Sequence, residues 1–162
     1  MRETYIHYGH SHFDINKFDQ VHNITFRNKP FGGLWSCPTV DKDIDWNEWC
    51  INNDFDANRE EWFKFVLSED AKVKVVCTNK DLETLPRIKE YKNAFGSSAI
   101  FNEDIDFEAL AKEYDAILVY MYRTNEGWLE SMYQKLYGWD VDTLFVFNPN
   151  IIKEVDSSER HS

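Results

Sequence analysis

Six residues of this 162-residue chain are of types that could hold and cleave a small ligand. They are His7, Gly9, Trp35, Ser36, Asp140 and Asp142. An aromatic ring offers a platform for a flat ligand, and a carboxylate stabilises positive charge that develops on a group bonded to it. Asp140 and Asp142 lie two positions apart, so an extended chain would place both carboxylates on the same side.

Each of these features also has a purely structural interpretation. A histidine on an apolar strand is often a hydrogen-bonded part of the core, and acids that lead into a strand are common at surfaces. Gly32-Gly33 can simply make a turn, because glycine readily adopts positive φ. His10, His12 and Asp14 raise the possibility of a metal site, but no fourth ligand is apparent, so a solvated loop is the favoured interpretation and no metal is predicted.

The apolar pattern predicts the strands that would position these residues. Strands are expected at 4–9, 34–37, 62–67, 71–78, 116–122 and 143–147. Only Ser68-Glu69-Asp70 separates the third and fourth of these, so they could form a hairpin. The stretch between Phe13 and Val21 is expected to be a loosely structured crossing, and Asn148-Pro149-Asn150 is expected to stop the last strand.

Four helices are expected between the strands. Apolar side chains at helical spacing follow Asp45, Asn79 and Asp106, and each of these residues can cap the helix after it. The fourth helix covers 128–138 and would close at Gly138. No regular β-α-β order appears, which favours an α+β fold in one domain over 1–155, followed by a polar, frayed tail at 156–162.

Composition limits the classes of function. Apolar residues make up 43% and aromatic residues 16% of the chain, enough for a substantial core. The net charge of −11 argues against direct nucleic-acid binding, because phosphate neutralisation supplies most of that affinity. Cys37, Cys50 and Cys77 give neither a disulfide framework nor a zinc pattern. No apolar run is long enough for a signal peptide or a membrane span, so a cytoplasmic protein is expected.

The order of four segments resembles the ADP-ribosyltransferase-like fold, in particular its branch with a histidine, an aromatic residue and an acid. The segments are Ile6-His7-Tyr8-Gly9, Gly32-Gly33-Leu34-Trp35-Ser36-Cys37-Pro38, Trp46-Asn47-Glu48-Trp49-Cys50, and Tyr114-Asp115-Ala116-Ile117 with 140–149. The resemblance spans most of the chain. It implies mixed, mainly antiparallel strands in a split sheet flanked by helices.

The resemblance also implies an NAD site. His7 would hydrogen-bond a ribose hydroxyl, the backbone at Gly9 would meet the nicotinamide amide, Trp35 would stack on the nicotinamide ring, and Ser36 would brace the site. Three positions depart from the usual pattern of the family. Tyr8 separates His7 from Gly9, a tryptophan stands where tyrosine is commoner, and the late acid is an aspartate rather than a glutamate.

The implied catalytic acid is Asp142, with Asp140 as the alternative. The expected function is therefore an NAD-binding ADP-ribosyltransferase that modifies a macromolecular acceptor, most simply a protein, and releases nicotinamide. Two other hypotheses remain open. The chain could be a non-catalytic acidic protein that blocks a basic, nucleic-acid-binding partner. It could also be a relic of the fold that keeps a groove without the chemistry.

Overall fold

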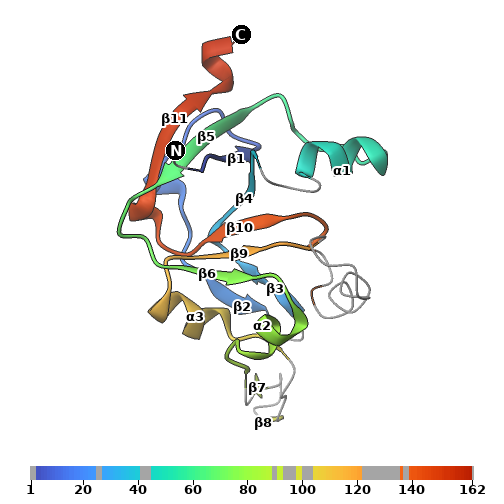
Figure 1. The fold of residues 1–162 in the computed structure, drawn as a ribbon, viewed down its shortest axis with the longest axis vertical. Coiled ribbons are helices and arrows are strands. Elements are labelled where there is room, and N and C mark those ends of the chain that lie inside the picture. Colours follow the sequence, from blue (N-terminus) through green and yellow to red (C-terminus); the bar gives the residue numbers. More distant parts are fainter. Residues whose placement is uncertain are drawn as a thin grey trace.

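The candidate residues belong mainly to one mixed sheet of seven strands (Figure 1). The computed structural model describes residues 3–24, 27–40, 45–88, 91–92, 98–99, 104–121, 136 and 139–161. The strands are β1 (Tyr5–Tyr8), β2 (His22–Ile24), β3 (Arg27–Phe31), β4 (Leu34–Pro38), β5 (Trp62–Leu67), β6 (Val73–Val76), β7 (Tyr91–Lys92), β8 (Ser98–Ala99), β9 (Ala116–Val119), β10 (Thr143–Val146) and β11 (Ile152–Ser157). The α-helices are α1 (Trp46–Asn52), α2 (Asn79–Glu83) and α3 (Phe107–Glu113), and 3-10 helices cover Ile15–Lys17, Pro149–Ile151 and Ser158–His161.

The strand order of the large sheet is β11-β5-β1-β4-β10-β9-β6. Its strand pairs are antiparallel except β6 and β9, which run parallel. Two further two-stranded sheets pair β2 with β3 and β7 with β8. The prediction of an α+β domain with mixed, mainly antiparallel strands is therefore confirmed.

Strand β4 joins two halves of this sheet, and each half uses a different part of it. Leu34, Trp35 and Ser36 pair with β10, whereas Cys37 and Pro38 pair with β1. Strands β1 and β10 therefore diverge from β4 at opposite ends. The hydrogen-bonded order nevertheless runs through β4 without a break, so the two halves remain joined there rather than forming separate sheets.

Two hydrophobic clusters hold these halves in place. One cluster lies between them and combines residues of β1 and β5, such as Tyr5 and Phe65, with residues of β9 and β10, such as Leu118 and Leu144. The other cluster packs the β10-β9-β6 half against α2, α3 and the end of the segment before β2. Figure 1 shows α2, α3 and the β2–β3 pair gathered at this half of the molecule.

The helices begin where the sequence places capping residues, with one difference. The carboxylate of Asp45 accepts from the backbone N–H of Glu48 at the start of α1, and that of Asp106 accepts from the N–H of Ala109 at the start of α3. The cap of α2 is Thr78 rather than Asn79. Thr78 forms a reciprocal capping box with Asp81, which satisfies two backbone donors instead of one.

The predicted hairpin between 62–67 and 71–78 is wrong, although both strands exist. Strand β5 has partners on both sides, β1 and β11, while β6 lies at the far end of the sheet beside β9. Asp115 fixes this position because its carboxylate accepts from the backbone N–H of Lys72 at 2.8 Å, and its own N–H donates to the carbonyl of Lys72 at 2.7 Å. The turn at Ser68–Asp70 thus carries the chain from one half of the sheet to the other.

The expected loose crossing between Phe13 and Val21 agrees with the structure, which has only a short 3-10 helix, Ile15–Lys17, in that stretch. The strand pair after this crossing was not predicted, and the polar tail differs from the prediction. Residues after Val21 form the β2–β3 pair, and residues after Pro149 return as β11 against β5. Ser157 is fully buried, so residues 156–161 belong to the fold rather than to a frayed tail. The sequence of β11 is hard to recognise as a strand. Its middle residues alternate between exposed and half-buried positions, but polar and apolar residue types do not follow that alternation.

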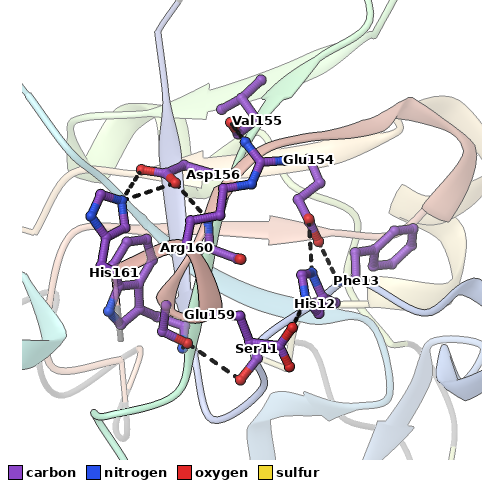
Figure 2. Close-up of polar contacts among 12 residues, drawn as sticks. Ser11, His12, Phe13, Glu154, Val155, Asp156, Glu159, Arg160 and His161 are labelled. Atoms are coloured by element: carbon purple, nitrogen blue, oxygen red, sulfur yellow. Dashed lines mark hydrogen bonds and ion pairs between the residues drawn. The ribbon is translucent and has the colours of Figure 1, made fainter.

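A histidine ties the C-terminal segment to the loop after β1 (Figure 2). The ring nitrogens of His12 contact Glu154 at 3.0 Å and Glu159 at 2.6 Å. Glu154 also accepts from the backbone N–H of Phe13 at 2.8 Å. Hydrogen bonds to the two carboxylates raise the pKa of His12, which favours its charged form.

The two glycines between β3 and β4 are required by close packing. Gly32 and Gly33 both have positive φ, 78° and 66°. A Cβ on Gly33 would lie 2.3 Å from the ring of Phe145, and one on Gly32 would lie 2.3 Å from the carbonyl oxygen of Gln20. This turn brings β4 directly against β10, so its role is structural.

The predicted helix at 128–138 falls almost wholly outside the described residues. Among the described helices, none combines the length and apolar character needed to cross a bilayer.

Candidate functional site

The site is organised around a hydrogen bond between β1 and β4, at the point where the two strands separate. Nδ1 of His7 lies 2.7 Å from the backbone carbonyl oxygen of Trp35. Since a carbonyl can only accept, Nδ1 carries the proton and donates it. Nε2 of His7 lies 2.9 Å from Nδ1 of His10, and in the neutral His7 this nitrogen is the acceptor. The imidazole therefore links β1 to β4 at the point where the backbone pairing of these strands ends.

Burial keeps this imidazole neutral. Removal from water lowers the pKa of His7 from 6.5 to about 4, against the opposing effect of its hydrogen bond to the carbonyl of Trp35, while His10 nearby lowers it further. His7 is therefore neutral at physiological pH. The neutral ring, with its proton on Nδ1, forms a fixed hydrogen-bonded link between β1 and β4.

A hollow of about 220 Å³ opens beside the hydrogen bond between His7 and Trp35. Its lining includes His7, Trp35, Ser36, Trp46, Trp139 and Asp140. These residues come from β1, β4, α1 and the segment before β10, which are far apart in the sequence. The volume is below the roughly 300–1,000 Å³ of pockets that bury a drug-sized ligand. We call this space the larger hollow because a neighbouring one that shares His7 and Trp35 is smaller. A more voluminous and more open depression of about 400 Å³ lies elsewhere, at Lys72, Asp115 and Asn148. The larger hollow suits one flat ring and its immediate substituent.

Aromatic rings form much of the wall of the larger hollow. The ring of Trp35 meets that of Trp139 edge-on at a centroid distance of 4.9 Å and tilts against Phe145 at 4.5 Å. The indole N–H of Trp139 donates to the carbonyl of Asn28 at 2.6 Å, so this ring is fixed in place. Nζ of Lys29 lies 5.4 Å from the centroid of Trp35 and adds a positive charge to an otherwise aromatic wall.

Ser36 adds a side-chain hydrogen bond between β4 and β10 in the lining of the larger hollow. Its hydroxyl is buried and donates to the carbonyl of Leu144 in β10 at 2.8 Å. The hydrogen bond links two strands, and the role in a ligand site that the family resemblance implies for Ser36 stays a prediction.

The two late aspartates lie in different environments. Asp140 lines the larger hollow, whereas Asp142 does not. Asp142 is fully buried, and its carboxylate accepts from the backbone N–H of Met121 at 2.7 Å. The chain bends at Val141, so the consecutive residues Asp140 and Val141 both line the larger hollow and Asp142 no longer shares the side of Asp140. Val141 and Thr143 face the larger hollow, and Asp142 between them points to the opposite side.

Gly9 does not line the larger hollow either. Its φ of 116° is a conformation that favours glycine. Its backbone N–H already donates to the carbonyl of Glu61 at 2.8 Å, which continues the pairing of β1 with β5. The residues predicted from the sequence thus divide into a group at the hollow, His7, Trp35, Ser36 and Asp140, and a group away from it, Gly9 and Asp142.

A second, smaller hollow of about 140 Å³ lies on the other side of the His7–Trp35 contact. His7 and Trp35 line both spaces, and His10, His12 and Lys17 line only the smaller one. His10 bonds to His7 and His12 bonds to glutamates, so these histidines do not converge. In the part of the chain that the structure describes, no three His, Cys, Asp or Glu side chains are arranged to hold a metal ion.

Sequence reasoning did not identify Lys29, Trp139 and Tyr8 as residues of the hollow. Burial raises the pKa of Tyr8 to about 12, so its phenol stays protonated. Trp46 also reaches the hollow, from α1. The position of Trp139 directly before Asp140 is a signal that could have pointed to the hollow. The ring of Trp139 is buried and hydrogen-bonded, and it therefore fixes the backbone beside Asp140.

Comparisons of the chain with family profiles, with curated proteins and with solved structures found no significant match.

The first prediction separates the two aspartates by their effect on stability. Replacing Asp142 with Ala leaves the buried N–H of Met121 without its acceptor, so we expect a loss of about 1–3 kcal/mol in the free energy of unfolding. Asp140→Ala removes a carboxylate beside a hollow and should change stability much less. Urea unfolding of both variants measures the difference, and equal losses would contradict the assignment.

The second prediction concerns His7 and pH. The folded-state pKa of His7 is about 4, below the ordinary value of 6.5, so the unfolded chain binds a proton there that the folded chain does not. Stability is therefore unaffected by His7 above pH 6.5 and is lost as the pH falls from 6.5 toward 4. Complete loss over that window corresponds to roughly 3 kcal/mol.

The matched variant for this experiment is His7→Asn. Its amide N–H can still donate to the carbonyl of Trp35, but it does not titrate. The free energy of unfolding of the unmodified protein should therefore fall relative to that of the variant, by up to roughly 3 kcal/mol, as the pH falls from 6.5 toward 4. Parallel curves would show that His7 is not held neutral by the fold.

Proposed function

We propose that the larger hollow binds the nicotinamide end of NAD and that the protein transfers ADP-ribose to a macromolecular acceptor, releasing nicotinamide. The observation that carries this proposal is the convergence of His7, Trp35, Ser36 and Asp140 on one hollow. These are four of the six residues that the family resemblance selects, and they come from both ends of the chain. The two halves of the sheet diverge at the same place.

The wall of the larger hollow suits this ligand. The nicotinamide ring of NAD is flat and positively charged, and aromatic faces attract such cations. Trp35 and Trp46 can supply those faces, and the buried Trp139 meets the ring of Trp35 edge-on. The ammonium of Lys29 lies over the ring of Trp35, so a stacked nicotinamide would displace it. Lys29 would then be free to meet the phosphates of the dinucleotide, most of which lies outside a hollow of this size.

Asp140 is the acid that this geometry assigns to the reaction. Breaking the bond between the ribose and nicotinamide leaves the electron pair on the ring nitrogen and develops positive charge on the sugar. A carboxylate bonded to the adjacent hydroxyl stabilises that charge as it forms. The acceptor nucleophile then forms the new bond to the ribose and loses its proton. Asp140 lies beside the hollow where the ribose would emerge, whereas Asp142 already accepts from the backbone.

His7 can take part only after its partner moves. Nδ1 is committed to the carbonyl of Trp35, and Nε2 is bonded to His10. His10 is exposed and comes from a loop, so a ribose hydroxyl could replace it on Nε2. In this proposal His7 positions the sugar at the wall between the two hollows, and its neutral state keeps Nε2 an acceptor.

The third prediction tests this proposal with NAD itself. Titration with NAD should quench the tryptophan fluorescence of the protein. Incubation with NAD and a mixture of acceptor proteins should release nicotinamide, which chromatography measures. Asp140→Asn should bind NAD with little change but release nicotinamide about 100-fold more slowly, because stabilisation of the developing charge is lost.

Glu113→Gln is the matched control, since it also removes one carboxylate but lies exposed on α3, away from the larger hollow. It should behave as the unmodified protein in both assays. The proposal fails if NAD neither quenches the fluorescence nor yields nicotinamide. The choice of acid fails if Asp140→Asn retains full turnover.

A further inference from the structure

Three aromatic side chains of α1 and the turn after it pack against one another. We call Trp46, Trp49 and Phe55 the aromatic ledge. The rings of Trp46 and Trp49 stack with centroids 5.2 Å apart and planes 8° apart. Phe55 meets both of them edge-on or tilted, at 5.7 and 5.5 Å. Phe55 is 47% exposed, so the ledge is open to solvent at this ring.

The chain holds the outer ring of this ledge in place with an unusual turn. Asp54 has a φ of 51°, the left-handed conformation that aspartate tolerates better than most residues. The turn lets the backbone N–H of Phe55 donate to the carbonyl of Cys50 at 2.9 Å. Phe55 is thereby folded back onto the two tryptophans. The strained backbone conformation of Asp54 thus holds the ring of Phe55 at the surface rather than in the core.

Negative charge surrounds the aromatic ledge. Residues 45–61 contain six Asp or Glu and a single basic residue, Arg59. Arg59 donates to the side chain of Asn47 at 2.9 Å and is therefore directed toward α1. Glu48, Asp54 and Asp56 are exposed. Exposed aromatic faces beside carboxylates are complementary to ammonium and guanidinium groups, which interact with both.

We propose that the aromatic ledge docks a lysine- or arginine-rich segment of a partner protein. A second copy of this chain fits less well, because it would bring carboxylates against carboxylates on a protein of net charge −11. Nucleic acid would be repelled for the same reason. Figure 1 shows α1 at the edge of the molecule, away from β11 and α3, where an extended segment can approach it.

The ledge adjoins the larger hollow through Trp46, which belongs to both. A segment docked on the ledge would therefore lie at the side of that hollow. The inference itself does not depend on NAD, because it is argued from the exposed rings and the charges around them. Its test can accordingly be made without any nucleotide.

The experiment measures binding of a short fluorescent peptide of alternating lysine and glycine to the full chain, by fluorescence anisotropy at low salt. The same peptide with acetylated lysines is the probe control. We expect the lysine peptide to bind and the acetylated peptide not to bind. Asp54→Asn combined with Phe55→Ala should weaken binding at least about tenfold, and asparagine keeps the left-handed turn accessible.

The matched control is Asp70→Asn combined with Phe31→Ala. It removes the same charge and a phenylalanine that is somewhat more exposed, 57% against 47% for Phe55, at positions outside the ledge. It should bind the peptide as the unmodified chain does, and circular dichroism checks the fold of both double variants. Absence of binding by the unmodified chain would overturn the proposal outright, and equal weakening in the two variants would overturn it in favour of diffuse charge attraction. Self-association that only the ledge variant loses, without peptide binding, would overturn it in favour of a second copy.

Discussion

The hydrogen bond between His7 and the carbonyl of Trp35 is the contact on which the site depends. It stands where β1 stops pairing with β4 and β4 begins to pair with β10. Without it, the separation of the strands would leave the partly buried carbonyl of Trp35 without this partner and would release the side chain that lines both hollows. The same bond fixes the proton on Nδ1, so Nε2 faces the smaller hollow as an acceptor. The side chain of His7 is therefore both a structural link between two strands and a candidate ligand contact.

Local patterns in the sequence were sufficient for elements whose signals are short-range. The alternation at 62–67, the run at 116–119 and the caps Asp45 and Asp106 all predict what the structure contains. The pairing of strands was not predictable in the same way, because it depends on distant contacts. The hairpin after β5 fails for this reason. Asp115 holds β6 beside β9, and nothing near the intervening turn signals that attachment.

The two aspartates show the same limit at the site. Their spacing alone predicts one shared side, and a bend at Val141 undoes it. Trp139, buried and bonded to Asn28, fixes the chain just before the bend, so Asp140 stays at the hollow while Asp142 is drawn to the N–H of Met121. The type and order of residues were therefore informative about which side chains gather. They could not determine which carboxylate of the pair faces the ligand.

The central claim is that the divergence of β1 and β10 from β4 creates a single ligand site with tryptophans in its wall. Nuclear magnetic resonance of the indole N–H groups during titration with nicotinamide tests it most directly. We expect the signals of Trp35, Trp46 and Trp139 to shift, while Trp62, which stacks with His161 and does not line the hollow, stays unchanged. Shifts at Trp62 alone, or at none of the four, would contradict the account.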